Sequence, residues 1–142
     1  MKRRSKIVST HACDENHQVV SVSTDGGGAF RTSPCAECPW RLDAPIGAFP
    51  VEAYRHSARC AYDMAGNMFA CHMAGAEKPQ TCAGFVLSRS AEHNMGVRWA
   101  IIKGRLYFGT ISSDVPTYET YREMAVANGV DPDDPALRPC RD

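Results

Sequence analysis

Four cysteines give the clearest chemical signal in this sequence. Cys35 and Cys38 form a C-x2-C motif, and Cys71 and Cys82 follow it, so that the whole pattern reads C-x2-C-x32-C-x10-C. A C-x2-C loop brings two thiolates together on one turn, which suits a metal ion or one edge of an iron–sulfur cluster. We call these four residues the motif cysteines. Their pattern predicts a single metal centre with four sulfur ligands and no catalytic side chain of its own.

Two other interpretations of the motif cysteines remain open. Cys35 and Cys38 could form a redox dithiol, but that motif normally lies where a strand passes into a helix of a βαβ unit. Here Pro39 follows the second cysteine and no βαβ pattern surrounds it. The motif cysteines could also be small buried apolar residues. Metal binding is preferred because four cysteines, one of them next to His72, share the pattern.

The spacing fits two cofactors. Zinc sites often use paired C-x2–4-C loops, whereas ten residues lie between Cys71 and Cys82. Iron–sulfur clusters tolerate irregular spacing, and Cys38-Pro39 resembles the Cys-Pro step of bacterial ferredoxins, although the dense ferredoxin spacing is missing. The expected cofactor is therefore a [4Fe–4S] cluster or Zn²⁺, with a slight preference for the cluster.

Three neighbouring residues are expected to support the centre. Adjacent residues seldom bind the same ion, so His72 is expected to donate a hydrogen bond to a thiolate or carbonyl rather than to act as a ligand. Trp40 is expected to shield the centre from water, and Arg41 to offset the charge of four thiolates. Ordinary roles in the core and on the surface are the alternatives for these two. The other cysteines are not expected to be ligands: Cys13, Cys60 and Cys140.

The surrounding elements follow from periodicity and from proline. Prolines predict an ordered loop over 34–50, which contains two motif cysteines. Apolar spacing predicts helices over 51–65, 82–93 and 116–128. The last of these is expected to be capped by Asp114 and stopped by Asn128-Gly129. A strand is expected over 17–23 and an extended segment over 105–109, and residues 97–102 could be either helix or strand. Cys60 would then pack in the core on the first helix. The expected fold class is α+β, mainly α with a few short strands, organised around a four-cysteine metal centre.

Length and charge set the wider limits. A chain of 142 residues predicts one domain, here residues 17–131, with a flexible tail over 1–16 and an irregular tail over 132–142. Sixteen basic and sixteen acidic residues give no overall attraction to nucleic acid or to an anionic membrane. No apolar run reaches the roughly 20 residues of a membrane span, and no secretory signal is visible. A cytoplasmic protein is expected, in which clustered cysteines bind metal more often than they form disulfides.

The motifs together resemble a family of small, uncharacterised proteins of phages, prophages and bacteria. The resemblance rests on four segments: Cys35–Arg41 (CxxCPWR), Phe69–His72 (FxCH), Cys82–Phe85 (CAGF) and Met124–Val130. It implies a phage or mobile-element context in a bacterial host cell. It implies no established activity, so whether the protein is an enzyme stays open.

Three functions are compatible with these observations. The first is a small accessory protein whose metal centre is a scaffold for binding or regulating a macromolecular partner, with a protein expected ahead of nucleic acid and no membrane. The second is a redox-active [4Fe–4S] electron carrier or sensor. The third is a metalloenzyme in which water fills an open coordination position.

Overall fold

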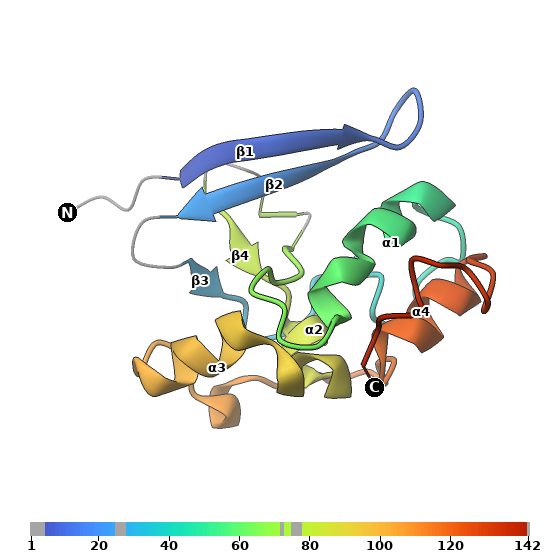
Figure 1. Ribbon diagram of the computed structural model, residues 1–142. Helices are drawn as coiled ribbons and strands as arrows, with labels where there is room; N and C mark the ends of the chain where they lie inside the picture. The colour runs from blue at the N-terminus through green and yellow to red at the C-terminus, as the bar shows by residue number, and fades with distance from the viewer. Residues whose placement is uncertain (1–4, 25–27, 72, 75–77, 142) are drawn as a thin grey trace.

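The computed structural model describes residues 5–24, 28–71, 73–74 and 78–141. Its elements are, in chain order, β1 (Ser5–Ala12), β2 (Gln18–Thr24), β3 (Ala29–Phe30), α1 (Val51–Ser57), the 3-10 helix η1 (Ala58–Ala61), β4 (Gln80–Thr81), α2 (Ala83–Leu87), the 3-10 helix η2 (Arg89–His93), α3 (Met95–Ile102), the 3-10 helix η3 (Phe108–Thr110) and α4 (Tyr121–Ala127). Figure 1 shows these short helices gathered on one side of a long hairpin. The described residues thus confirm the expected mixed α+β class.

The hairpin corrects the expectation of a flexible N-terminal tail. The strand predicted over 17–23 is present as β2, but β1 pairs with it in antiparallel fashion from Ser5 opposite Thr24 to Ala12 opposite Gln18. Most β1 side chains are exposed, so main-chain hydrogen bonds rather than burial hold this strand. That explains why hydrophobic periodicity gave no sign of it. Residues 1–4 lie outside the described part of the chain.

The first two helical segments lie where the sequence predicts them, but they are shorter. The helix expected over 51–65 begins at Val51, directly after Pro50, and continues from α1 into η1 before it ends at Ala61. It buries Tyr54 and, as expected, Cys60. The helix expected over 82–93 is divided into α2 and η2.

The ambiguous segment around 97–102 is helical. The side chain of Asn94 caps α3 by accepting a hydrogen bond from the backbone N–H of Val97 at 3.1 Å. Gly104, with φ of +70°, then turns the chain back at the end of the helix. The extended segment expected over 105–109 is correct only in part: Tyr107 is extended, and the backbone then bends into η3 at Phe108.

The last helix begins later than expected. Thr120 rather than Asp114 is its N-cap, since its Oγ1 accepts a hydrogen bond from the Glu123 N–H at 3.2 Å. The predicted stop is confirmed: Asn128 is the C-cap, and Gly129 has φ of +102°.

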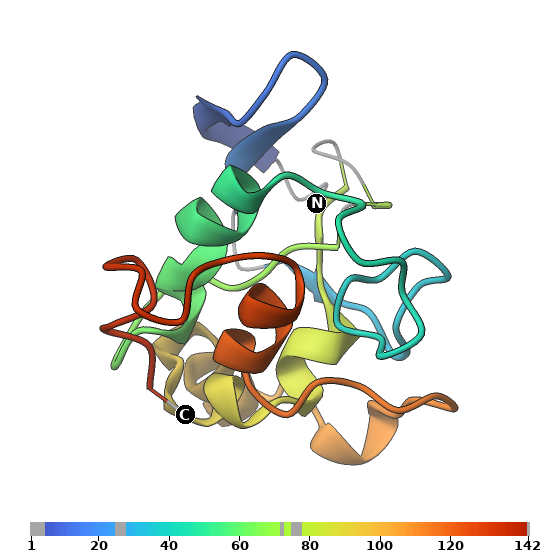
Figure 2. The ribbon, with the colours of Figure 1, turned by 90° about the vertical axis from the view of Figure 1, so that its right-hand side faces the viewer.

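The core lies where α4 meets α1 and α2. Figure 2 shows α4 between those two helices, and Tyr121 at its start is fully buried. The C-terminal segment is irregular, as expected, but Leu137 and Cys140 are buried against the domain. The irregular tail expected over 132–142 therefore packs onto the domain in part. No helix in the described part of the chain has the length and apolar content needed to cross a lipid bilayer.

Candidate metal centre

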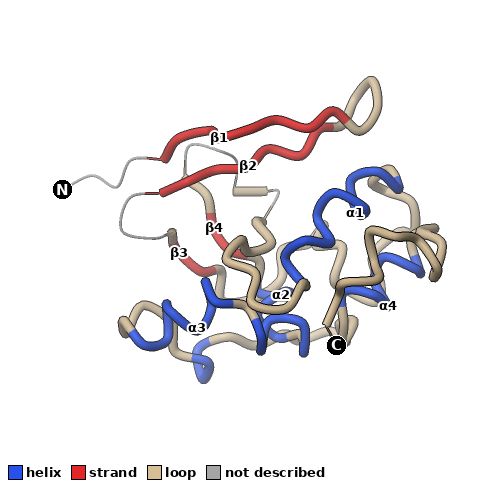
Figure 3. The backbone as a smooth tube through the Cα atoms, viewed as in Figure 1, coloured by secondary structure: helices blue, strands red, loops and turns tan. Residues whose placement is uncertain are grey.

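Two motif cysteines, Cys35 and Cys38, lie in one loop, and the other two, Cys71 and Cys82, lie beside a small sheet. Figure 3 shows that the chain between β3 and α1 is almost entirely loop. In this loop the Cys38 N–H donates to the Cys35 carbonyl at 3.1 Å and closes the C-x2-C turn. The turn fixes the separation of the first two thiols without any helix or strand.

The other two thiols are positioned by strand pairing. Ala70 forms an antiparallel bridge with Thr81. The Cys71 N–H donates to the Gln80 carbonyl at 2.7 Å, and the Cys82 N–H donates to the Phe69 carbonyl at 2.8 Å. Because side chains alternate along paired strands, Cys71 and Cys82 are diagonal neighbours on one face. β4 also pairs in parallel with β3 on its other edge, so this position is held from both sides.

The structure brings the motif cysteines together as two pairs. The Sγ atoms of Cys38 and Cys82 are 3.4 Å apart, and the thiol of Cys35 interacts with that of Cys71. The charge of Cys38 also acts on Cys35, so the pairs are neighbours. All four residues are at most 5% exposed and none is in a disulfide.

Backbone N–H groups favour the thiolate form at three of the four motif cysteines. The N–H of Glu37 interacts with the Cys35 thiol, and those of Trp40 and Arg41 interact with the Cys38 thiol. The N–H groups of Gly84 and Phe85, at the start of α2, do the same for Cys82. Donors aimed at sulfur favour thiolate over thiol. The local backbone is therefore arranged for negatively charged sulfur.

One proton is shared within the closer pair. The hydrogen bond from Cys82 lowers the pKa of Cys38 to about 7. The same bond, reinforced by burial, raises the pKa of Cys82 well above its usual range. Burial also raises the pKa of Cys35. At neutral pH the protein without metal thus holds Cys38 close to ionisation and Cys82 protonated, and a metal ion that binds here must displace the Cys82 proton.

The donor set fits a metal in part. Two thiolates on one tetrahedral zinc ion lie about 3.8 Å apart, given Zn–S bonds of about 2.3 Å, and the Cys38–Cys82 distance is close to that value. Among the described residues, however, no group of three or more Cys, His, Asp or Glu side chains is arranged to hold an ion. The two pairs would have to draw together around a single ion, or bind separate iron atoms of a cluster.

Trp40 closes the site on its inner side. Its ring is fully buried and packs edge-on against Phe69 and Tyr121, each with centroids 5.8 Å away, and at a tilt against Phe85. The expected shielding of the sulfurs by Trp40 stays a prediction. Its indole Nε1–H is buried and finds no hydrogen-bond partner among the described residues. Sequence reasoning did not single out Phe69, Phe85 and Tyr121 as neighbours of Trp40, although two of them stand in the FxCH and CAGF segments.

Arg41 lies at the edge of the site. Its guanidinium forms an ion pair with Asp43 at 2.7 Å and approaches the Cys35 carbonyl at 3.5 Å. Its positive charge helps to lower the pKa of Cys38, and its predicted role in offsetting four thiolates stays a prediction. His72 lies outside the described residues, so its predicted hydrogen-bonding role stays a prediction.

The remaining cysteines lie apart from the two pairs. Cys60 is buried on η1, where burial raises its pKa, as a core residue requires. Cys140 contacts the Ala58 carbonyl, and Cys13 contacts the His11 carbonyl at the hairpin turn. That none of these three cysteines is a ligand stays a prediction.

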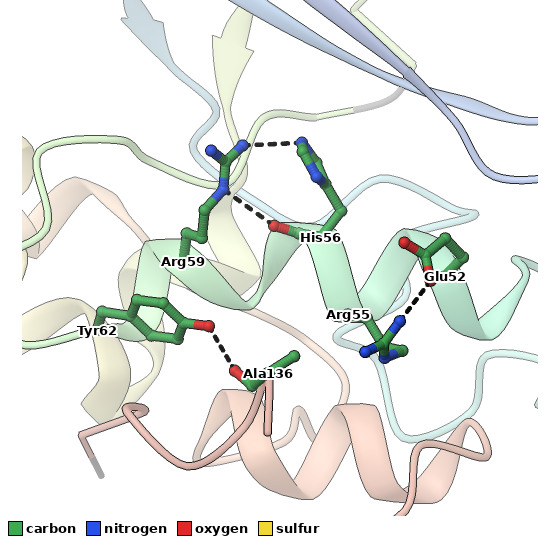
Figure 4. A pocket seen from close by; sticks show the side chains of 6 residues that line it. All are labelled: Glu52, Arg55, His56, Arg59, Tyr62 and Ala136. Carbon is green, nitrogen blue, oxygen red and sulfur yellow. Dashed lines mark hydrogen bonds and ion pairs between the residues drawn. The ribbon is translucent and has the colours of Figure 1, made fainter. Parts of the chain in front are cut away.

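A second cluster of polar side chains lines a surface pocket of about 250 Å³ (Figure 4). Arg55 pairs with both Glu52 and Asp134 at 2.8 Å, which compensates its charge. Arg59 donates to the ring of His56 at 2.8 Å. Sequence reasoning did not name this cluster, although Glu52, Arg55, His56 and Arg59 are spaced three or four residues apart, as one helix face requires. Its balanced charges make it weaker than the cysteine site as a functional candidate.

Comparison with known proteins gives one result. Residues 30–141 match a family of unknown function, DUF6283, and this range includes all four motif cysteines. No curated protein and no solved structure matches the chain. Since the match covers well over half of the sequence, the chain belongs to the DUF6283 family.

Proposed function

We propose that this protein is a small accessory protein in which Cys35, Cys38, Cys71 and Cys82 hold a zinc ion, and that this centre fixes a fold recognised by a macromolecular partner. The observation that carries the proposal is the meeting of four buried sulfurs as two neighbouring pairs, with the Cys38 and Cys82 Sγ atoms 3.4 Å apart. Backbone N–H groups near three of these sulfurs favour thiolate over thiol, and thiolates buried together need a cation. Bound zinc would supply that positive charge and cross-link the segments.

The energetic balance favours a structural role. Zinc binding contributes about 10–16 kcal/mol in small zinc-binding peptides, whereas a whole domain is stable by only about 5–15 kcal/mol. The site joins the irregular loop over 34–50 to β4 and α2, which are short elements with few hydrogen bonds of their own. A cross-link at this point would therefore stabilise the segments that most need it.

A [4Fe–4S] cluster is the second candidate, and with it a redox carrier or sensor. The observation in its favour is that the four sulfurs form two pairs and that no three described ligands meet at one point. A cluster places each thiolate on a different iron atom, so it tolerates wider spacing than one ion does. The 3.4 Å separation of the Cys38 and Cys82 sulfurs favours zinc instead.

The test is metal analysis of protein purified with and without oxygen. The proposal expects colourless protein with about one zinc per chain, whereas brown protein with about four irons per chain supports the cluster. Cys82→Ser should lose the metal, and Cys13→Ser, a matched change at a partly exposed cysteine, should keep it. Metal-free wild-type protein that is fully folded under both conditions would refute both candidates.

A further inference from the structure

The end of the molecule opposite the hairpin carries an exposed apolar surface. Figure 1 shows α3 on the side away from β1 and β2. Trp99 is 53% exposed, Ile102 73%, Tyr107 66% and Phe108 46%. Soluble proteins rarely leave several large side chains of this kind uncovered in neighbouring positions, and such patches commonly mark a binding surface.

Backbone hydrogen bonds hold these side chains on one lobe. The N–H groups of Arg105 and Leu106 both donate to the Ala100 carbonyl, at 2.9 and 3.3 Å, so the chain folds back onto α3. Leu106 is buried and anchors the turn. The hydroxyl of Tyr107 lies beside Gly104, at the end of the helix. The exposed rings are therefore held on a fixed backbone, although no core packing fixes the rings themselves.

The charges on this lobe have one sign. Between Glu92 and Asp114 the sequence contains three cations, at 98, 103 and 105, and no acidic residue. Among the described residues, none of these cations forms an ion pair with a carboxylate. Arg98 is held by the Glu92 carbonyl at 2.8 Å, and the Lys103 ammonium lies 5.0 Å from the centre of the Trp99 ring. Although the net charge of the whole chain is zero, this lobe therefore carries positive charge without a carboxylate partner, and that charge lies beside exposed aromatic rings.

We propose that this lobe binds single-stranded nucleic acid. Bases would stack on the aromatic rings Trp99, Tyr107 and Phe108, and phosphates would contact the two exposed cations, Arg98 and Lys103. Aromatic platforms interleaved with basic residues are the usual means of binding a single strand without reading its sequence. The inference rests on the proposed function, because it specifies the class of macromolecular partner that the metal-centred fold is proposed to bind.

The observations favour a single strand over two other anionic partners. A membrane-binding helix presents a long apolar stripe beside a separate polar face, whereas α3 has eight residues and its lobe intermixes rings and cations. Duplex DNA hides its base faces and offers the rings nothing to stack on. The carboxylates of an acidic protein could pair with the cations. Such a protein, however, lacks the regular alternation of flat bases and negatively charged phosphates that a single strand offers to the rings and cations.

The experiment measures binding of a fluorescein-labelled oligo(dT) of 20 nucleotides to the full-length, metal-loaded protein by fluorescence anisotropy, from 20 to 200 mM salt. Two phosphate contacts predict a slope of log K against log salt of about −1.4. Lys103→Gln should make that slope shallower by about 0.7. Trp99→Ala should weaken binding about 10-fold and leave the slope unchanged.

Matched controls separate this lobe from general charge and general apolar surface. Arg141→Gln removes one exposed cation that pairs with Asp63, and Leu42→Ala removes one exposed apolar side chain elsewhere. Neither should change binding. A 20-base-pair duplex and poly-L-glutamate should bind more weakly than the single strand.

Several results would overturn the inference. The first is that no oligonucleotide binds at 20 mM salt. The second is that neither Trp99→Ala nor Lys103→Gln changes the binding. The third is that the protein binds vesicles with anionic phosphatidylglycerol headgroups more tightly than it binds the oligonucleotide. If the protein carries its metal and yet fails these tests, the inference fails and the proposed metal centre stands. If Cys82→Ser protein folds without metal and still binds the oligonucleotide, the metal proposal fails and the inference stands.

Discussion

The backbone of Gly84 packs directly against the side chain of Trp40, with no room between them for a Cβ. An added Cβ would collide with the Trp40 Cβ and lie 3.3 Å from the Cys38 sulfur. The glycine of the CAGF segment is thus explained by close packing between the start of α2 and the C-x2-C loop.

The first prediction follows from this contact. Gly84→Ala should lower the free energy of unfolding by about 1–3 kcal/mol, the usual cost of overpacking a filled core. It should also reduce bound metal, because it moves the loop that carries Cys38. Chemical denaturation and metal analysis measure the two effects. Gly66→Ala is the control, since open space surrounds that position, and an equal loss there would mean that the contact with Trp40 is not the cause.

A second prediction concerns Asn94, a fully buried amide. Its Nδ2 donates to the Asn67 carbonyl at 2.7 Å and to the Cys60 carbonyl at 3.1 Å, while its Oδ1 caps α3. Asn94→Ala should therefore lower the free energy of unfolding by about 3 kcal/mol, the sum of a lost cap and unsatisfied carbonyls. Thr120→Ala removes one capping bond and should cost only about 1 kcal/mol. Similar losses in both variants would contradict the network at Asn94.

A third prediction is a pH dependence at His56. Burial lowers the pKa of His56, and the neighbouring Arg59 and His11 lower it further. The folded protein therefore binds this proton less readily than the unfolded chain does. The stability from neutral His56 is present above its unfolded pKa and is lost as pH falls from that value through the lower pKa of the folded protein.

NMR titration of the imidazole checks this pH dependence. The midpoint for His56 should lie below its ordinary value, and Arg59→Ala should raise it part of the way back, because burial remains. The ring of His11 stacks on that of His56 at 4.1 Å, so His11→Ala should raise the midpoint as well. A midpoint that stays the same in both variants would contradict the proposed electrostatic cause.

A fourth prediction concerns removal of the metal. Treatment of the metal-loaded protein with a strong chelator should lower its Tm, because ligand binding to the folded state stabilises it by mass action. Cys82→Ser protein should already have the low Tm and should not respond further. Calorimetry with and without chelator measures both. An unchanged Tm for the wild-type protein that has lost its metal would mean that the centre is not structural.

The sequence predicted the site better than it predicted the elements around it. Cysteine chemistry limits the motif cysteines to few arrangements, and the structure brings them together in two buried pairs. Pro50 and Gly129 also act locally, so the start of α1 and the end of α4 were predicted correctly.

The features that sequence reasoning missed depend on contacts distant in the chain. β1 has no apolar face and exists through pairing with β2. The bridge between Ala70 and Thr81 is too short to give a periodic pattern, yet it sets the positions of two motif cysteines. Thr120 was a local signal that sequence reasoning overlooked, because Asp114 stood closer to the predicted helix start.

Cys38 and Cys82 pair in space but lie far apart in the sequence, and this has a consequence for synthesis of the chain. Cys38 and Cys82 are 44 residues apart, so at about 5–20 residues per second the first thiol leaves the ribosome roughly two to nine seconds before its partner. During that interval the nascent C-x2-C loop is open to oxidants and to any soft metal ion nearby. Growth conditions at the moment of translation should therefore influence which ion the finished protein contains.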